Sequence, residues 1–221
     1  MAESLGFCCF EPAPFRSKLK EPSFAQFKPH DLVPFLEYKL YANNQLPDLT
    51  NISEPRLFGT HIPFASLGNS IQNSDAKIVY ICRNPLDTFV SSWHFLNKVK
   101  PESGSPISME EAFDMYCKGI VGFGPFWDHM LGYWKESLLR PNKVLFLKYE
   151  DMKEDGAFQL KNGKFLGFPF TLEEERGGVV ENIAKLCCFE NMKKLEVNKI
   201  GSSIGNFENK TCLEKLRWEI G

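Results

Sequence analysis

An arginine stands at a place in the chain where a phosphate could bind. Arg83 ends the apolar, β-branched run 76–83 (AKIVYICR), and Pro85 follows it. The run is typical of a buried parallel strand, and proline suits the first turn of a helix. An arginine beside a helix N-terminus combines a fork of N–H donors with the positive end of the helix dipole. The pattern predicts an anion site, although an Arg83–Asp87 ion pair, with Ser91 an ordinary helix residue, fits the spacing as well.

Two other side chains follow predicted strands. Tyr149 comes after the apolar run 143–148 (KVLFLK), where an aromatic at the sheet rim is the ordinary interpretation. His61 follows the short segment 55–60, and an imidazole can act as a general base because its pKa lies near neutrality. A histidine at a strand end is more often structural, so His61 by itself leaves catalysis open.

The cysteine and histidine pattern argues against a metal or disulfide framework. Seven cysteines are an odd number, and the adjacent pairs Cys8–Cys9 and Cys187–Cys188 lack the C-x-x-C spacing of zinc and redox sites. Cys82 lies in an apolar run and is interpreted as a small buried residue. We therefore expect no metal cofactor and a reducing compartment, the cytoplasm. No G-x-x-x-x-G-K-[ST] motif occurs in the sequence.

The elements that must position these residues alternate between strands and helices. Such alternation predicts an α/β fold, with a parallel sheet flanked by crossover helices. Ser108 and Glu111 have the spacing of a capping box that opens a helix. We predict strands over about 55–60, 76–83 and 143–148, and helices over about 30–36, 85–98, 108–118, 122–139, 158–166 and 172–192.

Composition narrows the possible partners. The chain has 221 residues, 43% of them hydrophobic and 14% aromatic, which suits one globular domain. A net charge of -2 argues against a nucleic-acid partner. No run approaches the ~18 apolar residues of a membrane span, and the N-terminus lacks the basic region and apolar core of a signal peptide. We expect neither nucleic acid nor membrane as a partner.

Several segments together resemble plant cytosolic sulfotransferases of the flavonol-sulfotransferase type. The resemblance runs over about 28–210 and rests on RLFGTHIPFASL, KIVYICRNPLDTFVSSWHFLNK, EEAFDMYCKGIVGFGPFWDHMLGYWKESL, PNKVLFLKYEDMKED and FLGFPFTLEEE. It implies a P-loop-nucleotide-kinase-like α/β domain and the sulfate donor 3′-phosphoadenylyl sulfate (PAPS). The implied acceptor is a hydroxyl of a small plant metabolite such as a flavonoid. The resemblance does not name the acceptor or the oligomeric state.

The resemblance also implies roles for individual residues. His61 matches the catalytic base of the family's T-H-x-P motif, which takes the proton of the acceptor hydroxyl during in-line sulfuryl transfer. Arg83 and Ser91 match the pair that binds the 3′-phosphate, and Tyr149 matches a tyrosine near the nucleotide. Phe189 matches an aromatic that packs on the adenine, and Cys187 falls where some members carry threonine or serine near the adenine.

Two segments of the family pattern are not found. The Y-P-K-S-G-T-T-W loop, whose lysine and amides hold the 5′-phosphosulfate, does not occur, and Asn209 to Thr211 lead into CLEKLRWEIG in place of R-K-G-x-x-G-D-W. We therefore expect an incomplete fold: an irregular, proline-rich leader over 1–29, a partial sulfotransferase domain over 30–200, and a flexible, divergent tail over 201–221.

The sequence leaves two main functions open and disfavours a third, a regulatory subunit that dimerises with an intact homologue. The first is PAPS-dependent sulfation of a small hydroxylated metabolite. The second is a catalytically inactive truncated homologue with at most weak nucleotide binding. Loss of fixed donors around a developing negative charge lowers rates severely, so we expect no measurable sulfation by the isolated 221-residue chain.

Overall fold

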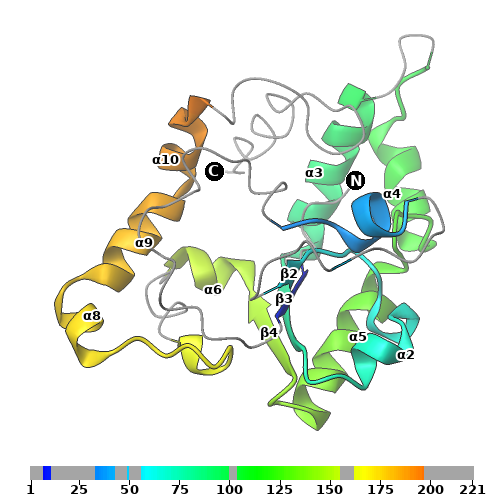
Figure 1. Cartoon of the computed structure of the whole chain (residues 1–221). Helices are drawn as coiled ribbons and strands as arrows, with labels where there is room; N and C mark the ends of the chain where they lie inside the picture. The colour runs from blue at the N-terminus through cyan, green and yellow to red at the C-terminus, as the bar shows by residue number, and fades with distance from the viewer. Residues whose placement is uncertain are drawn as a thin grey trace.

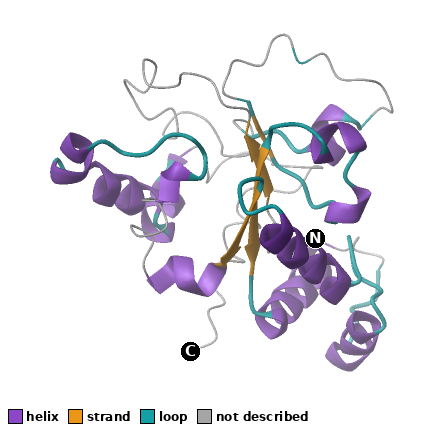
Figure 2. Cartoon of the chain, turned by 90° about the horizontal axis from the view of Figure 1, so that it is seen from below, coloured by secondary structure: helices purple, strands orange, loops and turns teal. Residues whose placement is uncertain are grey.

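The computed structural model describes residues 7–10, 33–42, 49, 56–99, 104–154 and 162–196. Four strands form one sheet in the order β2-β1-β3-β4, with helices on both of its faces (Figures 1 and 2). The strands are β1 (Phe7–Phe10), β2 (Leu57–Phe58), β3 (Lys77–Cys82) and β4 (Val144–Lys148).

The described helices range from single turns to four-turn helices. They are the π-helix η2 (Leu36–Leu40), the 3-10 turns η3 (Phe64–Ser66) and η4 (Asn162–Lys164), and the α-helices α2 (Asn69–Gln72), α3 (Pro85–Val99), α4 (Met109–Cys117), α5 (Phe126–Leu139), α6 (Tyr149–Glu154), α8 (Leu172–Arg176), α9 (Val179–Cys187) and α10 (Phe189–Lys194).

The parallel pair β3–β4 confirms the predicted α/β class. Ile78 lies opposite Val144 and Cys82 opposite Lys148, so the two strands end together. α3 begins at Pro85 after β3, and α6 begins at Tyr149 directly after β4. Arg83 and Tyr149 consequently leave the same edge of the sheet, as the sequence predicted.

The strand β1 corrects the prediction of an irregular leader for residues 7–10. It pairs antiparallel with β3, placing Cys8 opposite Val79, and antiparallel with β2, placing Cys9 opposite Phe58. An uncovered strand edge leaves a row of unpaired N–H and C=O groups, and β1 satisfies those of β3. The sheet is therefore mixed. The prolines that suggested irregularity stand after the strand, outside the described residues.

The helix predicted over 30–36 is displaced toward the C-terminus. Its first residues, 30–32, lie outside the described part of the chain. Phe35 forms a parallel bridge with Gly59, and the Gly59 N–H donates to the Pro34 carbonyl at 3.0 Å. The residue before a proline is also biased toward extended backbone. The helix therefore begins only at Leu36, as η2, and it is fastened to the end of β2.

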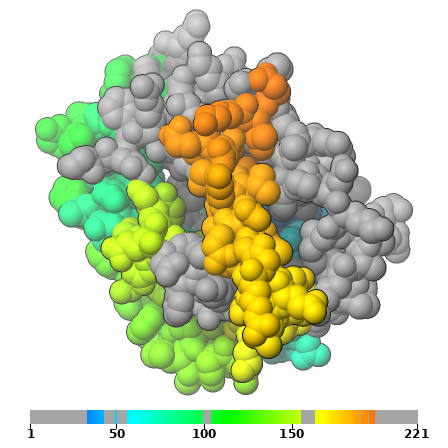
Figure 3. Space-filling model, turned by 90° about the vertical axis from the view of Figure 1, so that its left-hand side faces the viewer, coloured from blue at the N-terminus to red at the C-terminus, as the bar shows by residue number. Residues whose placement is uncertain are grey.

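The helix predicted over 172–192 is three short helices. Gly178 has a left-handed φ of 71° between α8 and α9, and Cys188 is extended between α9 and α10. Thr171 and Glu174 form a full capping box at α8, whereas at α4 only Ser108 accepts from the Glu111 N–H. These three helices form an arm on one side of the molecule (Figures 1 and 3). Residues 155–161 and 197–221 lie outside the described part of the chain, so the flexible tail remains a prediction. Of the helix predicted over 158–166, residues 162–166 are described, and they form the 3-10 turn η4 and a following turn and not an α-helix.

The described core sits between the sheet and α5. Alternate residues of β3, Ile78 and Tyr80, are fully buried and pack against Tyr133 of α5 and Val144 of β4. The rings of Tyr80 and Tyr133 stack at 4.5 Å between centroids. Cys82 belongs to the same cluster, and its burial raises the thiol pKa to about 11, as expected for a structural cysteine.

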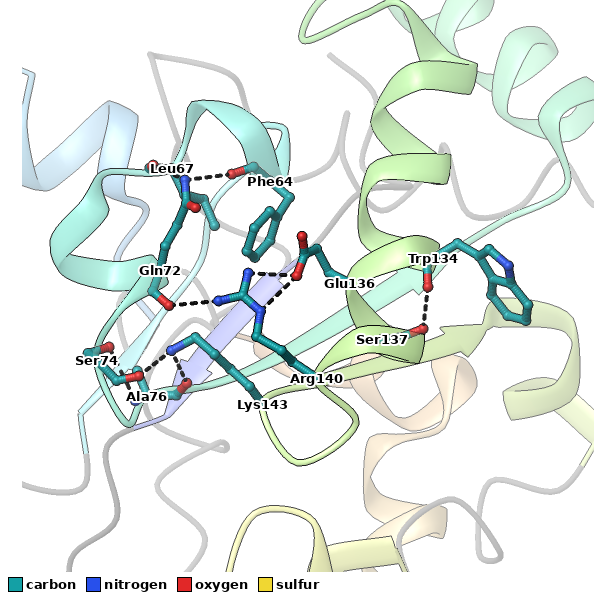
Figure 4. Close-up of polar contacts among 10 residues, drawn as sticks. All are labelled: Phe64, Leu67, Gln72, Ser74, Ala76, Trp134, Glu136, Ser137, Arg140 and Lys143. Atoms are coloured by element: carbon teal, nitrogen blue, oxygen red, sulfur yellow. Dashed lines mark hydrogen bonds and ion pairs between the residues drawn. The ribbon is translucent and has the colours of Figure 1, made fainter.

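A polar cluster fastens the end of α5 to the segment that follows the end of β2 (Figure 4). Arg140 Nε donates to Glu136 at 2.7 Å, and an Arg140 terminal N–H donates to the Gln72 carbonyl at 3.1 Å. The Gln72 side-chain amide donates to the carbonyls of Phe64 and Leu67. The Arg140 guanidinium also lies 5.0 Å from the centre of the Phe64 ring. The cluster ties α5 to η3 and α2, which lie far from it in the sequence.

A tight loop precedes α5. Phe123 takes a left-handed φ of 59°, which is unfavourable for a bulky residue. The carbonyl of Phe123 accepts a hydrogen bond from Nδ1 of buried His129 at 2.8 Å, which helps to hold this conformation. A Cβ on Gly124 would lie 2.5 Å from Val121 Cγ2 and 2.9 Å from the Gly119 carbonyl oxygen. The loop therefore depends on glycine at 124.

We predict that Gly124→Ala destabilises the protein by about 1–3 kcal/mol, because the new methyl group must displace backbone as well as a side chain. The matched control is Gly122→Ala in the same loop, where an added Cβ meets nothing within 4 Å and the effect stays within about 0.5 kcal/mol. Urea unfolding of the three proteins measures both changes. Equal loss in the two variants would contradict the steric argument.

Candidate active site

One carboxylate organises the residues that follow β2. Glu37 Oε1 accepts from the His61 backbone N–H at 2.8 Å and lies 2.6 Å from the His61 ring atom Nδ1. Its other oxygen, Oε2, accepts from the Thr60 hydroxyl at 3.0 Å. The Thr60 oxygen accepts in turn from the Ile62 N–H at 3.1 Å. Glu37 is thus bound by two consecutive residues that lie more than twenty positions away.

The pKa of Glu37 is lower than its ordinary value. Burial of the carboxyl works in the opposite direction, but the hydrogen bonds from the His61 side chain and backbone outweigh it. An ionised carboxylate only accepts hydrogen bonds, so the His61 nitrogen facing it carries a proton. Nε2 is then the ring nitrogen that can accept a proton from another molecule.

Aromatic rings fix the plane of the His61 imidazole. Phe35 stacks on one side, with 4.7 Å between ring centroids and an interplanar angle of 7°. Phe123 stacks at 5.3 Å and 20°, and Tyr38 is tilted against the ring at 5.8 Å. Burial and the nearby Glu37 raise the pKa of Tyr38 to about 12, so its phenol is neutral at physiological pH. These ring contacts restrict the imidazole to one orientation.

An apolar cavity adjoins the histidine through Phe123. Its volume is about 210 Å³, and it lies between α3, α4 and the loop before α5. A cavity of about 150 Å³ with apolar walls is enough to hold a benzene ring. Two polar side chains at its wall already have partners: Tyr116 donates to the Pro85 carbonyl and Trp93 to the Ile107 carbonyl. The aromatic and sulfur-containing members of its lining are Phe89, Trp93, Phe95, Met115, Tyr116, Phe123 and Phe126.

Arg83 retains unused hydrogen-bonding capacity. Its Nε is buried and has no hydrogen-bond partner among the described residues, although one terminal nitrogen lies 3.8 Å from Asp87. The guanidinium sits 5.0 Å from the centre of the Tyr149 ring. The Arg83–Asp87 pair foreseen as the alternative is therefore present, but it is long and does not use the buried donor. The arrangement fits an anion bound at the end of β3.

The other predicted site residues are placed less closely together. Ser91 is half-buried in α3, four residues after Asp87 and hence on the same helix face. Cys187 is an exposed thiol at the end of α9. Among the described residues no hydrogen bond, ion pair or ring contact joins Cys187 to Arg83 or Tyr149. Phe189 begins α10, and its side chain lies outside the described part of the structure.

Sequence reasoning missed the residues that surround His61. Phe35 falls at the end of the helix predicted over 30–36 and Phe123 at the start of the one predicted over 122–139, whereas Glu37 and Tyr38 are given no role. A signal was available, since a catalytic histidine commonly needs a carboxylate or carbonyl to fix its tautomer. The acidic residue in PFLEY was a candidate for that partner.

Other kinds of site are not found in the described ranges. No three His, Cys, Asp or Glu residues among them gather in a way that could hold a metal ion. None of the described helices is both long and apolar enough to cross a bilayer.

Curated relatives share most of this chain. Cytosolic sulfotransferase 15 of Arabidopsis thaliana is 58% identical over 203 residues, which cover 91% of this chain and 56% of that protein. Cytosolic sulfotransferase 14 of the same plant is 56% identical over 204 residues, covering 91% of this chain and 59% of its own length. The chain thus spans less than two thirds of the length of these relatives.

Solved structures and a family model agree with these relatives. A putative steroid sulphotransferase of Arabidopsis thaliana aligns with a TM-score of 0.64 and 40% identity, over 89% of this chain and 64% of that one. Mouse sulfotransferase SULT7A1, complexed with PAP, aligns with a TM-score of 0.58 and 29% identity, over 72% and 54%. Residues 9–216 match the family model described as Sulfotransferase domain. On this match and these identities, the chain belongs to the sulfotransferase family.

Proposed function

We propose that this chain carries out PAPS-dependent sulfation of a hydroxyl group on a small metabolite, with His61 as the general base. The observation that supports this most strongly is the Glu37–His61 contact of 2.6 Å. In this contact Nδ1 is hydrogen-bonded to Glu37, and Nε2 is left to accept a proton. A positioned base of this kind typically accelerates proton abstraction by ~10²–10⁴-fold.

The nucleotide would be held at the carboxyl edge of the sheet. PAPS, when bound, supplies the sulfuryl group for in-line transfer. Arg83, with its buried unpartnered Nε, would bind the 3′-phosphate together with Ser91, and Tyr149 would lie near the nucleotide. Cys187 and Phe189 would line the adenine, as the family pattern implies. The PAP complex of the mouse relative supports a nucleotide of this kind.

The acceptor would occupy the apolar cavity beside Phe123. A flat hydroxylated ring system suits its size and walls, which supports a flavonol as the first substrate class. The description of the Arabidopsis structure as a putative steroid sulphotransferase makes a hydroxysteroid the second class to test. The names of the curated relatives support action in the cytosol.

One observation favours a second candidate function. The 221 residues contain no Y-P-K-S-G-T-T-W segment, whose lysine and amides hold the 5′-phosphosulfate in the family pattern. Working without such a segment, the chain would bind the diphosphonucleotide and transfer no sulfate. Binding and transfer are therefore tested separately.

Nucleotide binding is tested at Arg83. We expect Arg83→Gln to weaken the binding of 3′-phosphoadenosine 5′-phosphate at least about tenfold, because a charge-assisted bond contributes ~1.5–3 kcal/mol. Lys135→Gln, which removes the same charge from an exposed position of α5, should leave the affinity unchanged. Isothermal titration calorimetry measures both dissociation constants. Equal affinities in the two variants would remove Arg83 from the nucleotide site.

Transfer is tested at His61. We expect His61→Asn to lower the rate of transfer from labelled PAPS to a flavonol or hydroxysteroid by about 10²–10⁴-fold. Asparagine has no nitrogen in place of Nε2, so it cannot act as the base. It can keep a hydrogen bond to Glu37, so the site should stay in place and nucleotide affinity should be retained. Transfer that persists in this variant contradicts the role of His61. Arg83-dependent binding with no transfer by the unmodified chain establishes the second candidate.

A further inference from the structure

We propose that Glu37 is a positioning residue for His61, holding the imidazole in the tautomer that carries its proton on Nδ1 and leaves Nε2 unprotonated. Its consequence for catalysis rests on the proposed function above, but the tautomer itself does not. The inference concerns a side chain that touches the base and not the reacting atoms.

The geometry of the pair leaves one assignment for the proton. Glu37 Oε1 is 2.6 Å from His61 Nδ1, a distance typical of a strong charge-assisted hydrogen bond. Glu37 is ionised at neutral pH because its hydrogen bonds lower its pKa despite burial. A carboxylate donates nothing, so a contact this short requires Nδ1–H.

The pair is sheltered from water. The side chains of Glu37 and His61 are only 13% and 7% exposed. A buried carboxylate without donors is costly, which favours the arrangement in which the donors of Thr60 and His61 all remain directed at it. Competing water has little access, so the tautomer is set by the protein.

Backbone hydrogen bonds hold the segments that carry Glu37 and His61 next to each other. The Leu36 N–H donates to the Gly59 carbonyl at 2.9 Å and the Gly59 N–H donates to the Pro34 carbonyl at 3.0 Å. These bonds join η2 to the end of β2 immediately beside Glu37 and His61. The rings of Phe35 and Phe123 restrict tilting of the imidazole between them. Stacking does not determine which ring nitrogen of His61 carries the proton, whereas the contact with Glu37 does.

The same contact would act during transfer. When Nε2 accepts a proton the imidazole becomes positively charged, and an adjacent ionised carboxylate stabilises that charge. Glutamine at 37 would keep the shape but lose the charge. Its amide can either donate to or accept from Nδ1, so it no longer selects a tautomer.

The tautomer is measured by ¹⁵N NMR of the histidine ring nitrogens in the 221-residue chain at neutral pH. His61→Asn identifies the His61 signals among the four histidines by their disappearance. We expect the His61 signals to show a protonated Nδ1 and an unprotonated Nε2. A protonated Nε2 with a bare Nδ1 in the unmodified chain overturns the proposal, whether or not any variant folds.

Two variants separate positioning from support of the fold. Glu37→Gln should shift His61 to a mixture of tautomers or to the Nε2–H form. Thr60→Val, which removes only the hydrogen bond to Glu37 Oε2, should keep the Nδ1–H form. Circular dichroism shows that each variant is folded before its spectrum is interpreted. A folded Glu37→Gln protein with an unchanged tautomer also overturns the proposal.

The measurements distinguish failure of the proposed function from failure of the positioning role of Glu37. Absence of sulfate transfer in every protein, with the tautomer set as expected, rejects the enzyme and keeps the positioning role. Where transfer is measurable, Glu37→Gln should lower kcat at least about tenfold with nucleotide affinity unchanged, since a wrong tautomer removes the base. An unchanged kcat alongside a changed tautomer would show that His61 is not the base and leave Glu37 without a positioning role in catalysis.

Discussion

The parallel pairing of β3 with β4 is the constraint on which the rest of the molecule depends. Because Cys82 and Lys148 are opposite partners, the next residues, Arg83 and Tyr149, emerge together at one edge. Their cation–π contact at 5.0 Å follows directly from that register. A slip of one residue would turn one of the two side chains to the opposite face of the sheet. The anion site proposed here would therefore depend on strand pairing and not on Arg83 alone.

The histidine site depends on a different kind of contact, a buried carboxylate shared by two elements. Glu37 lies on a short π-helix and its donors, Thr60 and His61, lie just after β2, so its ionised form joins two segments that are far apart in the chain. Linkage gives this contact a pH dependence. The pKa of Glu37 is depressed in the folded protein, so its contribution to stability is present above its ordinary pKa and is lost as pH falls through the folded value.

The loop before α5 connects the histidine to the cavity. Phe123 lines the cavity, stacks on His61 and takes an unfavourable backbone conformation. Backbone strain is retained where the surrounding structure holds it in place, here through His129 and the close packing around Gly124. A ligand in the cavity would therefore contact the same ring that stacks on His61, so occupancy of the cavity is coupled to the imidazole through one side chain.

The sequence by itself determined closely the two strands that precede Arg83 and Tyr149, the helix starting at Pro85 and the candidacy of His61, because periodicity, proline and strand-end rules act over a few residues. Tertiary structure alone decided that Glu37 binds His61, that Phe123 stacks on it, and that the segment 7–10 pairs with β3. Each of those contacts joins residues far apart in the chain. No local pattern encodes which distant donor will satisfy a buried carboxylate or an open strand edge; only the folded arrangement brings the partners together.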